Sequence, residues 1–192
     1  MDIHRRARSD GFTHLSRVKV SVILADRGTS NPQSGTLNLL GAGWRATQLV
    51  SSQQGILTPP HVVVVFFEVD YSDCNHVIPL ELALLTEDGQ PVNIPGVPGN
   101  GELRMTHYVT VPSPGGAPLG TPGNGNAMIE IFPGLPLAPG GYRWNVSLAG
   151  RHEDEWYAAF RVNPMQQAPA MVFGAPPASP PPPPEGDQDG IS

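Results

Sequence analysis

The sequence predicts an all-β protein, an antiparallel sandwich in which two sheets pack face to face around one core. Three observations support this prediction: apolar and polar residues alternate in several short segments, turn-forming residues separate these segments, and one long apolar run is rich in valine. At 192 residues the chain suits one domain with tails. We expect a disordered arm at residues 1–16, the sandwich at residues 17–164, and a disordered, proline-rich, acidic tail at residues 165–192.

A hairpin within residues 135–162 is the clearest element. After a Pro-Gly-Gly turn at residues 139–141, large apolar side chains alternate with polar ones, and the alternation returns after a polar reversal at residues 150–154. A tyrosine directly after such a turn resembles the tyrosine corner of immunoglobulin-like sandwiches, where the phenol donates to the backbone of the preceding loop. We therefore expect an immunoglobulin-like order of about seven to nine strands; a hairpin of another all-β fold is the alternative. The apolar faces hold Tyr142, Trp144, Val146 and Leu148 on the first strand and Trp156, Ala158, Phe160 and Val162 on the second.

The beginning of the domain predicts two strands and a close bend. Residues 17–26 alternate apolar and polar side chains, and a turn-rich loop at residues 27–35 leads to a short strand at residues 36–40. The Gly-Ala-Gly segment at residues 41–43 does not match a phosphate-binding loop, because no Lys-Ser/Thr pair and no helical pattern follow it. We expect these glycines to let the chain pass closely over the sandwich, with Trp44 closing one end.

The middle of the domain contains its most hydrophobic strand. Residues 45–60 are compatible with a short helical turn or an extended crossover, whereas residues 61–70 are apolar on both faces and predict a central strand. Residues 77–86 predict the next strand. Two Pro-Gly-Asn-Gly segments, at residues 98–101 and 122–125, are interpreted as turns that each launch a strand.

Composition narrows the classes of partner. The net charge of −6 argues against nucleic acid, because binding to phosphate backbones depends on Lys and Arg. Cys74 is the single cysteine, so no disulfide can form within the chain. No segment approaches the roughly 18 apolar residues of a membrane span, and no apolar stretch follows the arginines near the start as in a cleaved signal. We expect a cytoplasmic protein that binds neither nucleic acid nor membrane.

No catalytic pattern is present in the sequence. The six histidines form no zinc-binding motif, and we expect no cofactor and no metal. Asp73, Cys74 and His76 crowd one loop, which makes a hydrolase based on Cys74 and His76 a remote alternative. The acidic run at residues 153–155 is interpreted as a soluble hairpin tip, with a loose calcium site as the alternative. We expect that the protein is not an enzyme.

Four stretches together resemble an uncharacterised bacterial family, a domain of unknown function found in actinobacteria and their phages. They are V-S-V-I-L-A-D and G-T-L-N-L-L-G-A-G-W near the start, E-L-A-L-L-T-E-D-G-Q-P-V in the middle, and P-L-A-P-G-G-Y-R-W in the closing hairpin. The resemblance covers residues 17–163 and implies a single β-sandwich. It implies no activity and carries over no site residues.

The leading functional hypothesis is a non-catalytic protein–protein interaction or structural module that uses its loops or an edge strand. A phage accessory protein, associated with the virion, is one form of this hypothesis. The alternative is a sandwich that binds carbohydrate or another small ligand through exposed aromatic side chains, for which Trp44, Tyr71 and Tyr108 are the candidates. The five consecutive prolines at residues 180–184 fit a spacer or a ligand of an aromatic-lined groove.

Overall fold

The computed structural model describes residues 15, 17–31, 35–97 and 101–166. Within them the regular elements are β-strands, apart from one short 3-10 turn, η1 (Tyr71–Asp73). The all-β prediction is therefore confirmed. The disorder expected of the two tails concerns residues that lie almost entirely outside this part of the chain.

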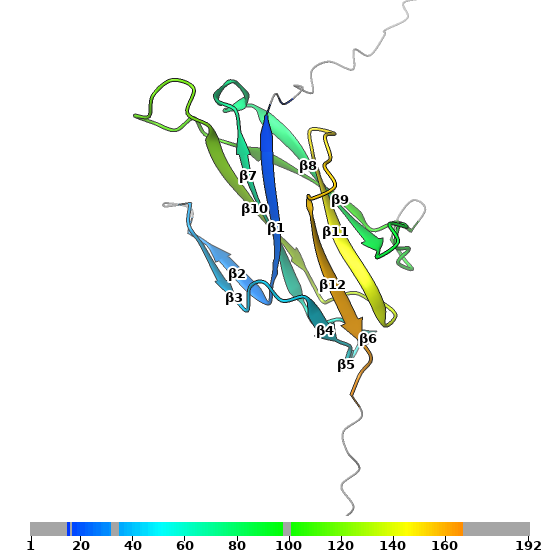
Figure 1. The fold of residues 1–192 in the computed structure, drawn as a ribbon. Helices are drawn as coiled ribbons and strands as arrows, with labels where there is room; N and C mark the ends of the chain where they lie inside the picture. The colour runs from blue at the N-terminus through cyan, green and yellow to red at the C-terminus, as the bar shows by residue number, and fades with distance from the viewer. Residues whose placement is uncertain (1–14, 16, 32–34, 98–100, 167–192) are drawn as a thin grey trace, which may run out of the picture.

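Two sheets form the body of the molecule and face each other across the core (Figure 1). The three-stranded sheet has the order β1-β7-β10, and the five-stranded sheet has the order β4-β12-β11-β8-β9. All strand pairs are antiparallel except β4 with β12, which is parallel. The bounds are β1 Val18–Ala25, β7 His61–Val69 and β10 Gly123–Ile131 in the first sheet, and β4 Ala46–Gln48, β8 Val77–Thr86, β9 Arg104–Thr110, β11 Gly140–Leu148 and β12 Tyr157–Asn163 in the second.

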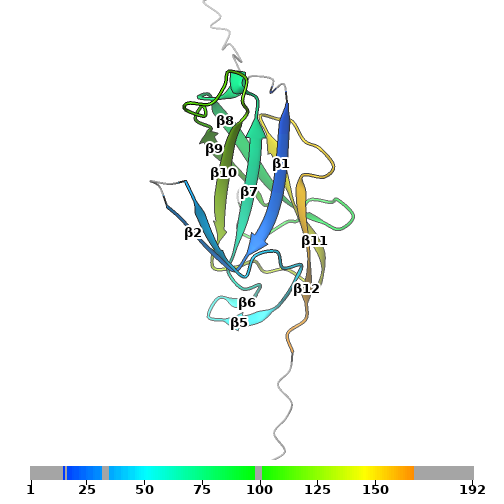
Figure 2. The same cartoon turned by 60° about the vertical axis from the view of Figure 1, so that its left-hand side comes forward.

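Two small ribbons complete the described elements (Figure 2). One pairs β2 (Arg27–Ser30) with β3 (Leu37–Leu40), and the other pairs β5 (Val50–Ser52) with β6 (Gly55–Leu57). The first ribbon lies against the outer face of β10, because a Cβ on Gly28 would be 2.4 Å from the sulfur of Met128. This cover explains why Val62 and Val64, which point away from the core, are buried as well.

The core consists of the inward-facing residues of both sheets. Alternate positions are buried along β8, β11 and β12, as the period of two predicts, whereas β7 is buried on both faces over most of its length. In the closing hairpin Trp144, Val146 and Leu148 are at most 1 % exposed. The strand predicted to be central, β7, lies between β1 and β10. Its inner face contributes Val63, Val65, Phe67 and Val69 to the core.

The tyrosine corner predicted for the hairpin is confirmed. The Tyr142 hydroxyl donates a hydrogen bond of 2.9 Å to the carbonyl oxygen of Ala138 in the preceding loop. Burial raises the pKa of the Tyr142 phenol, against the opposing effect of this bond, so the phenol keeps its proton and donates it. The Tyr142 ring also stacks on Phe160 of the neighbouring strand, with centroids 5.8 Å apart.

Two segments differ from the sequence prediction, and a third takes one of the two alternatives that the sequence left open. The loop expected at residues 27–35 contains β2, because its backbone pairs with the short strand that follows. Residues 45–60 take the extended alternative and contain three short strands. The turn expected at residues 122–125 is instead the start of β10. Gly123 and Gly125 face inward there, and neighbouring side chains leave no room for a larger residue. A Cβ on Gly125 would lie 2.3 Å from Phe67 and 3.0 Å from Val111.

Candidate functional site

The edge of β12 is covered over only part of its length. β11 pairs with one side of the strand, while β4 pairs with the other side only at Arg161–Asn163. The Arg161 amide donates to the carbonyl of Arg45 (2.9 Å), so the backbone of Arg161 points away from β11. Because backbone direction alternates along a strand, the N–H and C=O of Ala159 point to the same side. Among the described residues neither group has a backbone partner, so this part of the edge is open.

β1 presents a second partly open edge. On its outer side the Leu24 carbonyl accepts a hydrogen bond from the Gly43 amide (2.7 Å). Just beyond the strand, the Asp26 amide donates a hydrogen bond to the Leu40 carbonyl (3.0 Å). The segment from Leu40 to Gly43 therefore covers the end of this edge. It can pass so closely because Gly41 has φ +63° and a Cβ there would lie 2.1 Å from the Asp26 carboxylate. The close bend predicted for the Gly-Ala-Gly segment is thus confirmed.

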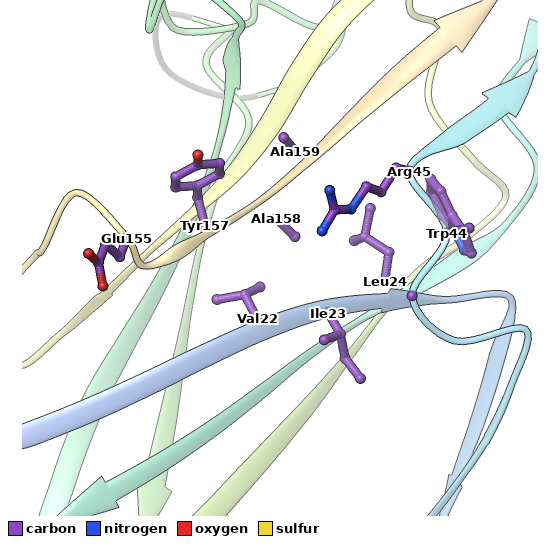
Figure 3. A pocket seen from close by; sticks show the side chains of 10 residues that line it. Val22, Ile23, Leu24, Trp44, Arg45, Glu155, Tyr157, Ala158 and Ala159 are labelled. Atoms are coloured by element: carbon purple, nitrogen blue, oxygen red, sulfur yellow. The ribbon is translucent and has the colours of Figure 1, made fainter.

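A cleft of about 400 Å³ lies between the two edges (Figure 3). Its apolar wall comes from β1, through Val22 and Leu24, and faces the small residue Ala158 on β12. The Arg45 guanidinium reaches into one end, and Glu155 stands at the other end, just before β12 begins (Figure 3). The cleft exists because alanine is too short to fill the space between two strands that belong to different sheets.

Aromatic packing fixes the end of the cleft at which Arg45 lies. The Trp44 ring meets the His61 and Phe160 rings edge-on, with centroids 5.6 Å and 5.8 Å away. His61 is 4 % exposed, and its Nδ1 lies 3.1 Å from the Pro59 carbonyl oxygen, to which it can only donate. Burial lowers the pKa of His61 and outweighs this hydrogen bond, so the imidazole is neutral. Trp44 therefore closes one end of the sandwich as a packed residue and holds Arg45 at the mouth of the cleft.

The three aromatic candidates for ligand binding lie far apart. Trp44 contacts His61, the first residue of β7, whereas Tyr71 follows the far end of that nine-residue strand, in η1. Tyr108, which is 69 % exposed, is on β9, and β11 and β8 separate β9 from β12. The structure does not bring these three side chains into one site. Of the three, only Trp44 lines the cleft.

The loop around Cys74 has the packing of a structural element. Cys74 is 4 % exposed, and its thiol donates to the Asp70 carbonyl oxygen at 3.6 Å. A Cβ on Gly123 would lie 2.5 Å from its sulfur, so the thiol is pressed against β10. His76 is exposed and lies immediately before β8. Among the described residues no group of three or more His, Cys, Asp and Glu side chains is arranged to hold a metal ion.

Sequence reasoning named Trp44 but missed the other residues of the cleft. The available signal is the pair Ala158-Ala159, two small residues inside a strand whose other core positions are large. Arg45 and Glu155 carry no signal, because their proximity to the cleft depends on the pairing of β4 with β12 and on the contact between β1 and β12.

Comparison with protein-family models and with curated proteins finds no match to this chain. None of the described helical segments has the length and apolar character needed to cross a bilayer.

Proposed function

We propose that this protein is a non-catalytic protein-interaction module that binds an extended segment of a partner protein as an added strand at the open edge of β12. Exposed strand edges bind peptides in this way, with the backbone supplying affinity and neighbouring pockets supplying specificity. The observation that carries the proposal is the unpaired backbone of Ala159 directly beside the apolar cleft.

The arrangement of the two sheets supports this mode of binding. A strand added beside Ala159 continues the line of β4, which already pairs with the far part of β12. Every second side chain of the added strand then points toward the core side, where the cleft offers contact with Val22, Leu24 and Ala158. Burying these apolar side chains adds to the backbone hydrogen bonds.

We also infer that the scaffold is immunoglobulin-like. The tyrosine corner at Tyr142 and the two facing antiparallel sheets support this finer description. In such a scaffold the hydrogen-bonded interior fixes the edges in space, so binding at an edge requires no rearrangement of the core.

Selection from a display library of random peptides tests the proposal. The bait is the full chain, and the comparison is Ala159→Pro, which removes the outward N–H without removing a bond to β11. We expect enriched peptides that alternate apolar and polar residues and that lose binding to Ala159→Pro. Ala159→Ser, which keeps the N–H, is the matched control and retains binding.

Amide hydrogen exchange provides the second readout. In the free protein the Ala159 amide exchanges as an open-edge group, and a bound strand slows its exchange. Failure of the selection to enrich any sequence, or enriched peptides that bind Ala159→Pro as well as the unchanged protein, contradicts the proposal.

A further inference from the structure

A second hollow, of about 330 Å³, lies on the outer face of the five-stranded sheet, on the other side of the same strand edge. Three arginines line it, namely Arg45, Arg143 and Arg161. The register explains its shape: Gly141 pairs with Arg161, and Ala159 pairs with Arg143. Small residues thus alternate with long ones across the two strands, so Gly141 and Ala159 form a floor and the arginines form the walls. The Glu87 carboxylate lies over Gly141, where a Cβ would be 2.3 Å from its Oε2. We call this site the arginine hollow.

The arginine hollow has an excess of positive charge. Its lining contains three guanidinium groups and a single carboxylate, that of Glu87, which lies 3.9 Å from Arg161. The Glu87 side chain is 73 % exposed and Arg161 is 63 % exposed, so solvent screens this pair strongly. The whole chain carries a net charge of −6, so this local excess of positive charge is opposite in sign to the charge of the protein.

One arginine is held in place and keeps a donor free. The Arg143 guanidinium carbon lies 5.7 Å from the centre of the Tyr157 ring, in a cation–π arrangement. Its Nε is buried and has no hydrogen-bond partner within the part of the chain that the structure describes. A buried donor without a partner is costly, so an acceptor that reached this Nε on binding would gain more than a surface ion pair does.

The arginine hollow and the cleft share three lining residues, Arg45, Tyr157 and Ala159. The two sites are therefore opposite faces of one strand edge. A strand added at this edge projects its side chains alternately to the two faces. The side chains on one face enter the apolar cleft, and the one beside Ala159 on the other face reaches the arginine hollow.

We propose that the partner segment carries an aspartate or glutamate whose carboxylate binds in the arginine hollow, between apolar residues that enter the cleft. This inference rests on the proposed function, because it assigns the chemistry of the strand bound there. The planar guanidinium donates two parallel hydrogen bonds to a carboxylate, which gives both affinity and a fixed register. The recognised pattern is apolar, acidic, apolar.

Synthetic peptides that differ in one side chain test this assignment. A peptide of about five residues alternates serine with valine and carries aspartate, asparagine or lysine at its central position, so that it fits the part of the edge that β4 leaves open. Binding to the full chain is measured by calorimetry at low and at high salt. We expect the aspartate peptide to bind about tenfold more tightly than the asparagine peptide, and the lysine peptide to bind most weakly. High salt reduces the advantage of aspartate.

Two arginine variants locate the effect. We expect Arg161→Gln and Arg45→Gln each to abolish the preference for aspartate over asparagine. Arg104→Gln is the matched control, because Arg104 is an exposed arginine on β9, the opposite edge strand of the same sheet. This control keeps the full preference.

The outcomes separate this inference from the proposed function. Equal affinity for the aspartate and asparagine peptides, with both lost in Ala159→Pro, overturns the acidic assignment and leaves strand addition intact. If no peptide binds, strand addition is itself contradicted. In that case acetate is titrated into the protein while the NMR resonance of the Arg143 Nε–H is followed. A shift in the unchanged protein that is absent in Arg161→Gln shows that the hollow binds a free anion. This result also overturns the assignment of a peptide carboxylate.

Discussion

The two lateral sides of the sandwich both carry small residues, with opposite results. On the side of β9 and β10, Gly123 and Gly125 face Val111, which fills the space between the sheets and is completely buried. On the side of β1 and β12, Ala158 and Ala159 line a cleft of about 400 Å³ that no described side chain fills. The space beside the small residues is therefore filled on one side of the sandwich and open on the other. Whether it is filled depends on the neighbouring side chains.

We expect the largest loss of stability from a substitution on the filled side, at Gly125 of β10. In Gly125→Val the new side chain meets Phe67 and Val111 at distances shorter than van der Waals contact, so we expect a loss of about 3 kcal/mol in the free energy of unfolding. Urea denaturation measures this loss. Asn124→Val, on the outer face of the same strand, is the control and changes stability by less than about 0.5 kcal/mol. A Gly125→Val protein as stable as this control contradicts the view that β10 is closely packed.

His61, in the aromatic cluster at one end of the cleft, makes the free energy of unfolding depend on pH. Burial lowers the pKa of His61 in the folded protein, whereas the histidine of the unfolded chain titrates at about 6.5. The unfolded state therefore binds more protons below pH 6.5, so stability is complete above that pH and falls as the pH drops toward the folded pKa. The slope reaches at most about 1.4 kcal/mol per pH unit.

Urea denaturation over a pH series measures this slope. His61→Phe keeps an aromatic ring in the cluster and removes the titrating group, so its slope is smaller. His107→Gln changes an exposed histidine on β9 and leaves the slope unaltered. An unchanged slope in His61→Phe means that other groups cause the acid sensitivity.

The tyrosine corner gives an intermediate effect. Tyr142→Phe removes the hydrogen bond to the Ala138 carbonyl and keeps the ring stacked on Phe160, so we expect a loss of about 1 kcal/mol. Thermal unfolding measures the loss.

The open side gives the smallest effect on stability. Ala158→Leu places a larger side chain in the cleft, where space is available, so the free energy of unfolding changes by less than about 1 kcal/mol. The same variant blocks the inward side chains of an added strand and abolishes peptide binding. A destabilisation as large as that of Gly125→Val shows that the two sides are packed alike and removes the contrast between them.

Local pattern predicted most of what lies inside the sandwich. The alternation in residues 142–148 and 156–162 gave the buried faces of β11 and β12, and the apolar run at residues 61–70 gave the central strand. The tyrosine corner also follows from a local signal, since Tyr142 bonds to a residue four positions earlier. Periodicity determines which face of a strand is buried, and it does so without knowledge of the partner strands.

The candidate site depends on pairings between distant residues, which periodicity does not encode. Arg45 reaches the cleft because β4 pairs in parallel with β12, more than 100 positions later in the chain. The arginine hollow requires the register that sets Gly141 beside Arg161. For the same reason the sequence pattern indicates a turn at residues 122–125, because Val111, which occupies the space beside Gly123 and Gly125, comes from another part of the chain.

The partial pairing of β4 limits how long a docked segment can be. β4 occupies the edge of β12 from Arg161 to Asn163, so a strand that joins beside Ala159 meets β4 end-on and cannot continue. A longer segment has to turn away from the sheet at that point. If strand addition occurs as proposed, the edge therefore favours chain termini, or segments followed directly by a turn, over long continuous strands.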